Sequence, residues 1–123
     1  MRKSVDVVII GGGINGCAIA YYLSKKGLDV TVIEKSYLGS GATGSCGAGI
    51  RQQWSTKENT ELAIKSVHLF ETLSDELGSD IEFTQGGYLI INHDIKEEEQ
   101  AIKNVSMQKS LGLNVSLVST DEI

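Results

Sequence analysis

The sequence has few cysteines, no excess of basic charge and no long apolar run. Its two cysteines, Cys17 and Cys46, are too few for a disulfide scaffold or a closed zinc site, so we expect free thiols in a reducing compartment. Eleven basic and sixteen acidic residues give a net charge of −5, which argues against nucleic acid as the main partner. The apolar run near the start contains Asp6 and is too short for a signal peptide or a membrane span. We therefore predict a cytoplasmic protein without an integral membrane segment.

The cysteines and histidines are predicted to have structural roles. Cys17 is expected to pack on a sheet, and Cys46 is expected to be a small buried side chain rather than a reactive thiol. Neither His68 nor His93 has a second ligand at metal-binding spacing, so the sequence predicts no metal site.

The first 34 residues predict a β-α-β unit. The apolar run 5–10 is typical of a strand that is buried on both faces of a parallel sheet. A predicted helix over 14–26 follows a glycine turn and stops at Gly27, and a second strand is predicted over 30–33. The connection between parallel strands should be right-handed. This order of elements indicates an α/β fold.

A glycine motif lies between the first strand and the helix. Gly11, Gly13 and Gly16 have the spacing of a dinucleotide-binding turn, where the backbone approaches a pyrophosphate and the helix start holds its charge. Glu34 ends the second strand, where a carboxylate can accept both hydroxyls of an adenosine ribose and would repel a 2′-phosphate. The alternative to a nucleotide site is a glycine-rich turn with an acid at the strand end by chance. That alternative requires the strand, the three glycines, the helix, the second strand and the acid to coincide.

Residues 36–50 are rich in glycine and other small residues. A flexible linker is one interpretation. A linker is unusual inside a domain, so we favour a loop in which the backbone approaches a ligand closely.

Further elements are predicted beyond this loop. Capping boxes formed by Ser55 with Glu58 and by Asp94 with Glu97 predict two helix starts. The corresponding helix ends are expected at Gly78 and Gly112, and strands are expected over 88–92 and 115–118. A third Ser-x-x-Glu pattern, over 119–122, comes one residue before the sequence stops. We therefore expect the chain to be part of a longer protein.

Three stretches together resemble flavoproteins of the D-amino acid oxidase superfamily. They are VVIIGGGINGCAIAYYLSKKGLDVTVIEK, GSGATGSCGAGIRQQW and QGGYLIIN. The resemblance covers nearly the whole chain, and it is strongest to amine-oxidising members such as the sarcosine oxidase β subunit, glycine oxidase and dye-linked proline dehydrogenase. It implies a Rossmann-type FAD-binding portion over 1–80 and the beginning of a substrate-binding domain over 81–123.

The resemblance also implies an activity. The expected reaction is oxidation of the C–N bond of a small amine or amino acid of the glycine, sarcosine, proline or D-amino acid class, by hydride transfer to FAD. The electron acceptor is left open between oxygen and another acceptor. Partner subunits are also left open, because similar proteins include hetero-oligomers.

Site residues follow from the same resemblance. Glu34 would bind the adenosine ribose, Lys35 would lie beside the adenine, and the Thr43 hydroxyl would donate to phosphate. Arg51 is the one charged residue expected near the flavin, where it would stabilise negative charge or steer a carboxylate substrate. A surface position or a structural ion pair is the equal alternative for Arg51, and other catalytic residues are expected beyond Ile123. The residues expected to bind the cofactor are Gly11, Gly13, Ile14, Asn15, Gly16, Glu34, Lys35, Ala42, Thr43, Gly44, Gly47, Gly49 and Ile50.

Three other functions stay open at this point. One is an FAD-dependent enzyme of the glycerol-3-phosphate dehydrogenase type, which also has a strand followed by a GGGxxG turn. A second is an NAD-dependent Rossmann enzyme. The third is a non-catalytic fragment that folds without cofactor or assembles with another chain. The isolated chain is expected to be inactive and to bind FAD weakly or not at all.

Overall fold

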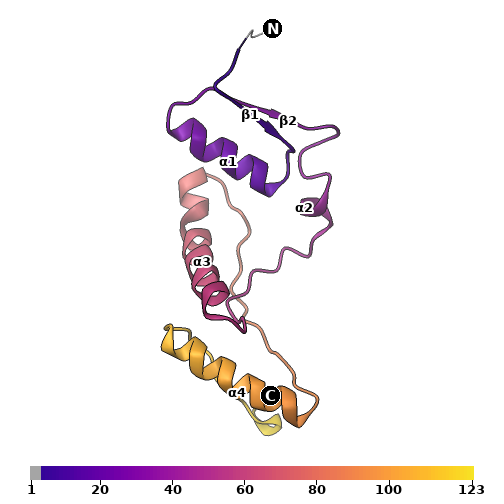
Figure 1. Cartoon of the computed structure of the whole chain (residues 1–123), viewed down its shortest axis with the longest axis vertical. Helices are drawn as coiled ribbons and strands as arrows, with labels where there is room; N and C mark the ends of the chain where they lie inside the picture. Colours follow the sequence, from indigo (N-terminus) through magenta and orange to yellow (C-terminus); the bar gives the residue numbers. More distant parts are fainter. Residues whose placement is uncertain (1–3) are drawn as a thin grey trace. The chain divides into compact units, whose positions relative to one another are not determined.

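The computed structural model describes residues 4–123, and the chain divides into two units, 1–49 and 50–123. Figure 1 gives the order of the elements along the chain. The division follows compactness alone, so the functional boundary after residue 80 stays a prediction.

The first unit contains the predicted β-α-β arrangement. Strand β1 (Val7–Ile10) and strand β2 (Val30–Ile33) pair in parallel, with Val7 opposite Val30 and Ile10 opposite Ile33. Helix α1 (Ile14–Lys25) connects them and packs against both strands (Figure 1). The strand over 30–33 is confirmed. The first strand begins two residues later than predicted, and the helix ends one residue earlier.

Polar contacts fix both ends of this small sheet. At the start of the strands, the Asp29 N–H donates to Asp6 Oδ2 at 2.8 Å, and the Asp6 N–H donates to the Asp29 carbonyl at 3.0 Å. At the other end, the Gly11 N–H donates to the Ile33 carbonyl at 2.8 Å. The ladder therefore continues into the glycine turn, and it holds the turn beside the end of β2.

The glycine-rich loop contains a short helix that the sequence did not predict. Helix α2 (Ala42–Ser45) forms one turn within residues 36–50. Cys46 follows it directly and is exposed, with its thiol 3.1 Å from the Thr43 carbonyl, so the predicted burial of Cys46 is wrong. The turn of helix ends at this residue, which leaves the side chain outside the packed part of the unit. Cys17 is half-buried, and both cysteines are free thiols.

The second unit contains two longer helices. Helix α3 (Lys57–Leu77) and helix α4 (Ile95–Ser110) contact each other, and a 3₁₀ turn, η1 (Thr120–Glu122), lies near the end of the chain. The most buried side chains are Thr60, Ala63 and Val67 on α3 and Gln108 on α4. Two of these four are polar, so hydrogen bonding decides much of how this core is arranged.

Helix caps agree with the sequence in part. The N-cap of α3 is Thr56, whose side chain accepts from the Asn59 N–H at 3.4 Å. The helix therefore begins one residue later than predicted, with a single N-cap in place of the capping box expected from Ser55 and Glu58. Gly78 ends α3 in the left-handed region, at φ +64°, as predicted.

The cap of α4 is also close to the prediction. Asp94 Oδ1 accepts from the Glu97 N–H at 2.9 Å, which confirms this helix start. The Glu97 carboxylate accepts in return from the His93 N–H at 2.7 Å, one residue before the cap. The last Ser-x-x-Glu pattern forms as well, with the Ser119 N–H donating to Glu122 Oε2 at 2.7 Å.

The strands predicted over 88–92 and 115–118 are not strands in the structure. A strand needs a hydrogen-bonded neighbour, and neither segment has a ladder partner within residues 4–123. Tyr88, Leu89, Ile90 and Ile91 are each at least half exposed. The apolar side chains over 88–91, which predicted a strand, are therefore exposed in this structure.

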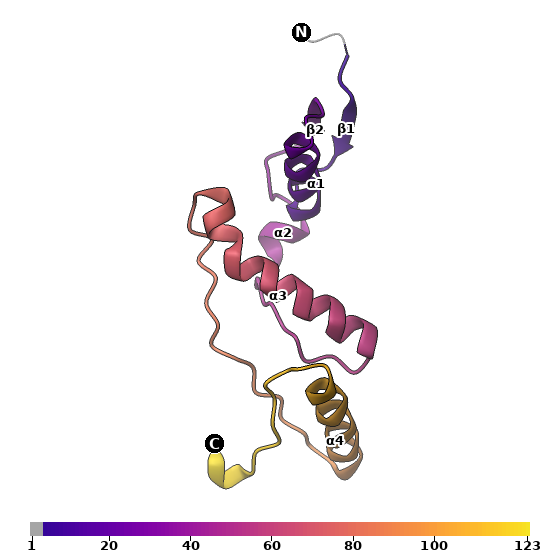
Figure 2. The ribbon, with the colours of Figure 1, turned by 90° about the vertical axis from the view of Figure 1, so that its left-hand side faces the viewer.

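The segment after α3 turns back along that helix (Figures 1 and 2). The rings of Phe70 and Phe83 lie 5.6 Å apart, and the Ile81 N–H donates to Ser74 Oγ at 3.2 Å. These contacts attach the segment after α3 to that helix.

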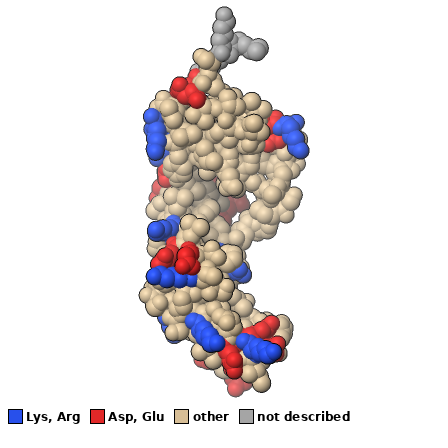
Figure 3. Space-filling view, viewed as in Figure 1, with Lys and Arg blue, Asp and Glu red and all other residues tan. Residues whose placement is uncertain are grey.

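The surface carries both signs of charge, and the helices are short or polar. Figure 3 shows a mostly uncharged face over the first unit and both signs of charge interspersed over the second. No continuous basic stripe crosses the face drawn there. Between residues 4 and 123, every helix is too short or too polar to cross a bilayer.

Candidate nucleotide site

The glycine turn after β1 has a shape that only glycine allows at two positions. Gly11 adopts φ +105°, where other residues are strained. Gly16 lies so close to the Gly11 carbonyl that a Cβ atom would overlap this oxygen. The tight turn and the close packing that the motif predicted are therefore present.

Thr43 supplies a cap for α1 from the second loop. Gly13 is the N-cap of this helix and has no side chain to accept a hydrogen bond. Thr43 Oγ1 accepts from the Ile14 N–H at 2.9 Å, from 29 residues further along the chain. A Cβ on Gly13 would lie only 3.0 Å from the same oxygen, so glycine at this position makes room for the threonine.

The oxygen and the proton of the Thr43 hydroxyl can serve different partners. The oxygen accepts from the helix, and its own proton remains available to a ligand at the turn. The sequence predicted Thr43 only as a phosphate donor and missed its role as a helix cap. No local signal predicts a cap that comes from so far along the chain.

Backbone hydrogen bonds connect the second loop to the turn. The Gly39 N–H donates to the Gly12 carbonyl at 2.8 Å, and the Gly44 N–H donates to the Gly39 carbonyl at 2.8 Å. A Cβ on Gly44 would lie 2.5 Å from the Gly39 oxygen, and one on Gly12 would lie 2.5 Å from Leu38 Cδ2. These residues are packed closely, so a flexible linker does not describe this part of the loop.

Glu34 faces the glycine turn, as the sequence predicted. Its Oε2 accepts from the Gly12 N–H at 2.8 Å, and its Oε1 accepts from the Ser36 N–H at 3.0 Å. The hydrogen bond from Gly12, followed by that from Ser36, lowers the pKa of Glu34. The half-buried carboxylate is therefore ionised at neutral pH and oriented, and its four lone pairs leave capacity for a further donor.

The remaining predicted residues are distributed along the chain as follows. Asn15 and Lys35 are exposed in the first unit, next to the turn and to Glu34 in sequence. Gly47 and Gly49 are exposed after α2. Of the three residues expected to approach the flavin, Gly47 and Gly49 belong to the first unit with the glycine turn, and Ile50 is the first residue of the second unit.

Arg51 stacks on an aromatic ring in the second unit. Its guanidinium carbon lies 4.3 Å from the centroid of the Trp54 ring. Within residues 4–123 the contact of this guanidinium is aromatic and no ion pair of Arg51 is present, but Arg51 is exposed, so the surface alternative stays open beside the predicted role at the flavin. Arg51 and Trp54 line a cavity of about 970 Å³, together with residues from 88–105 and 115–123.

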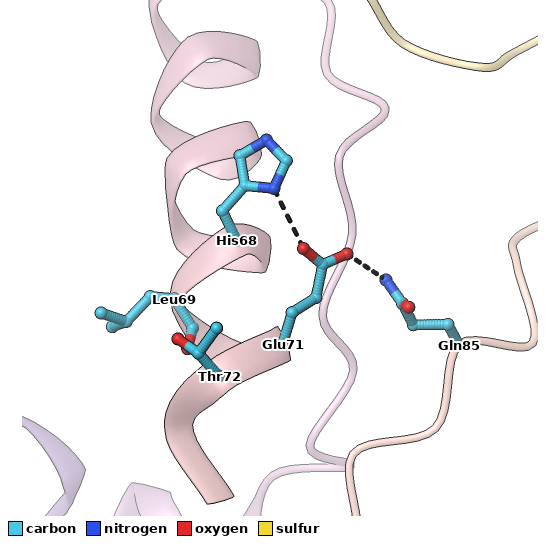
Figure 4. Close-up of polar contacts among 5 residues, drawn as sticks. All are labelled: His68, Leu69, Glu71, Thr72 and Gln85. Carbon is cyan, nitrogen blue, oxygen red and sulfur yellow. Dashed lines mark hydrogen bonds and ion pairs between the residues drawn. The ribbon is translucent and has the colours of Figure 1, made fainter. Parts of the chain in front are cut away.

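A three-residue polar network on α3 has a structural role. Figure 4 shows Glu71 between His68 and Gln85, with His68 Nδ1 at 3.0 Å from one carboxylate oxygen and Gln85 Nε2 at 3.0 Å from the other. The contact with His68 lowers the pKa of Glu71. The network attaches the returning segment to the helix. In the part of the chain that the structure describes, no cluster of His, Cys, Asp and Glu has the composition of a metal site.

Comparison with known proteins identifies the family. The family described as FAD dependent oxidoreductase (DAO) matches residues 6–123. The chain belongs to this family. Membership favours FAD over the NAD-dependent alternative, and it agrees with the glycine turn, the acid and the second loop found in the first unit.

Several known proteins are similar to this chain in sequence or structure. The chain is 35% identical to sarcosine oxidase subunit beta of Arthrobacter sp, over 99% of this chain and 31% of that protein. The structure of L-proline dehydrogenase from P.horikoshii matches with a TM-score of 0.89 and 39% identity, over 99% of this chain and 32% of that one. Glycine oxidase from Geobacillus kaustophilus matches with a TM-score of 0.85 and 27% identity, over 96% and 34%. The DAO-family chain thus has their Rossmann-type fold and spans about a third of their length.

Replacement of Thr43 tests the helix cap. We expect Thr43→Val to lower the free energy of unfolding of the first unit by about 1 kcal/mol, because the Ile14 N–H loses its acceptor. Thr43→Ser keeps the hydroxyl and should retain most of this stability. Hydrogen exchange at the Ile14 amide measures the effect directly. Equal exchange rates in the valine and serine variants would contradict the assignment.

Acid titration tests the environment of Glu34. Because folding lowers its pKa, the ionised carboxylate stabilises the fold above the ordinary glutamate pKa of about 4.3, and this contribution is lost as pH falls through the lower folded value. Wild type should therefore be more stable than Glu34→Gln at pH 7, and the difference should narrow below that ordinary pKa. Urea unfolding at a series of pH values measures it. If the difference in unfolding free energy between wild type and Glu34→Gln did not change as pH falls below about 4, the ionised carboxylate would not be the group that stabilises the fold.

Proposed function

We propose that this chain forms the ADP-binding part of the FAD site in an oxidoreductase that oxidises the C–N bond of a small amine or amino acid. The observation that carries this proposal is the environment of Gly12, which donates to the Glu34 carboxylate and accepts from the Gly39 N–H. The glycine turn, the acid and the second loop therefore meet at one residue. Sarcosine oxidase subunit beta, glycine oxidase and L-proline dehydrogenase, by their names, act on compounds of this class.

The first unit would hold the ADP half of the cofactor. The backbone over 11–16 would lie along the pyrophosphate, where the start of α1 favours negative charge. Glu34 would accept the ribose hydroxyls with the lone pairs that the backbone leaves available, and Lys35 would lie beside the adenine. The Thr43 hydroxyl would donate to phosphate between Ala42 and Gly44.

Residues after α2 would face the rest of the cofactor and the substrate. Gly47, Gly49 and Ile50 would allow the backbone to approach the flavin ring. When bound, FAD supplies the acceptor for a hydride from the carbon next to the substrate nitrogen. Arg51 would bind the carboxylate of an amino acid with its planar pair of donors, or stabilise negative charge at the ring. The chain would thus contribute binding and orientation to the reaction.

Location and assembly belong to the same proposal. Both cysteines are free thiols, which supports a reducing compartment such as the cytoplasm. One relative is a subunit by its name, which supports assembly with partner subunits.

A substrate screen tests the proposed reaction. An FAD-loaded enzyme that includes these 123 residues should reduce a dye acceptor with glycine, proline, N-methyl amino acids or D-amino acids. Arg51→Lys should raise the KM for an amino acid about tenfold or more, because it loses a paired hydrogen bond to the carboxylate. Oxidation of glycerol 3-phosphate without oxidation of any amine would contradict the proposal and favour the alcohol-oxidising alternative.

A further inference from the structure

Trp54 contacts Arg51 through both its ring and its indole N–H. The indole Nε1–H donates to the Arg51 carbonyl at 3.1 Å, and the ring lies under the guanidinium at 4.3 Å. One residue therefore restrains the backbone and the side chain of Arg51 together. A free arginine side chain samples many rotamers, and stacking on an aromatic face reduces that freedom.

Trp54 is itself restrained by a buried donor. Gln108 Nε2 donates to the Trp54 carbonyl at 2.8 Å, across 54 residues of sequence, and only 3% of Gln108 is exposed. The hydroxyl of the fully buried Thr60 donates to the Thr56 carbonyl at 2.8 Å and lies 3.4 Å from the Trp54 carbonyl. Gln108 therefore makes the short contact with Trp54. A buried amide is costly to leave without a partner, so the Gln108 contact fixes where the Trp54 backbone lies.

These residues belong to one cavity of the second unit. Arg51, Trp54 and Gln108 all line the space of about 970 Å³. Arg51 is exposed and Trp54, on the other side of the stack, is 40% exposed, whereas Gln108, which holds the Trp54 carbonyl, is buried on α4. A stacked, solvent-facing charge whose backbone support is hydrogen-bonded to a buried amide is suited to meet a ligand in a fixed orientation.

We propose that Trp54 is a positioning residue for Arg51, anchored by Gln108, and that it directs the guanidinium toward the carboxylate of an amino-acid substrate. The carboxylate part of this inference rests on the proposed function. The positioning part rests on the contacts of Trp54 alone, and the two parts can be tested separately.

Nuclear magnetic resonance of the 123-residue chain tests the positioning. The ring current of Trp54 should shift the Arg51 side-chain protons upfield in wild type and, more weakly, in Trp54→Phe. The shift should disappear in Trp54→Leu and decrease in Gln108→Met, because the anchor is lost. Gln100→Met is the matched control, since Gln100 bonds Asn104 on the same helix, and it should leave the shift unchanged. If Trp54→Leu fails to fold, the shift in Gln108→Met still tests whether Trp54 positions Arg51. An unshifted Arg51 in wild type, or an unchanged shift in Gln108→Met, overturns the positioning.

Kinetics of the FAD-loaded enzyme test the carboxylate part. Trp54→Leu should raise KM about tenfold for an amino acid while kcat changes less than about twofold, because the lost interaction is one of binding. KM for the matching amine without a carboxylate should not change, and Trp54→Phe should restore most of the amino-acid KM. Equal effects on both substrates, or no effect on either, overturn this part. An enzyme that oxidises no amine refutes the proposed function, whereas the proton shifts of Arg51 still decide the positioning.

Discussion

The first unit depends on close approach between the backbone of Gly12 and two later segments. The Gly12 N–H donates to Glu34 at the end of β2, and the Gly12 carbonyl accepts from the Gly39 N–H in the second loop. A Cβ on Gly12 would lie 2.5 Å from Leu38 Cδ2, so a side chain at this position would displace its neighbour. The same closeness places an oriented carboxylate beside the glycine turn. Stability and the proposed nucleotide binding would thus place the same demand on Gly12.

Local signals in the sequence predicted the elements that depend on local contacts. The strand over 30–33, the turn at Gly11 to Gly16, and the αL end at Gly78 each follow from a few neighbouring residues. The predicted strands over 88–92 and 115–118 failed because a strand depends on a neighbour that local composition cannot supply. The one-residue error at Thr56 has another cause, since Ser55 and Thr56 are both good caps and only the chain path selects between them.

The positions of the candidate site residues were predicted unevenly for the same reason. The direction of Glu34 follows from its place after a strand, and the structure has its carboxylate at the turn. The cap that Thr43 gives to α1 and the contact of Gln108 with Trp54 join residues 29 and 54 positions apart, which no spacing rule covers. Through the second contact, α4 holds the residue on which Arg51 stacks. The two units therefore supply different parts of the proposed chemistry, one for the nucleotide and one for the substrate carboxylate.

The central claim is that the glycine turn over 11–16 binds a diphosphate nucleotide through main-chain donors. Titration of the 123-residue chain with ADP, followed by amide nuclear magnetic resonance, tests it most directly, since this method detects even weak binding. The account predicts that the largest shifts occur at the amides over 12–16 and around Thr43, and that Glu34→Gln reduces them. Shifts confined to other parts of the chain, or none at millimolar ADP, would contradict it.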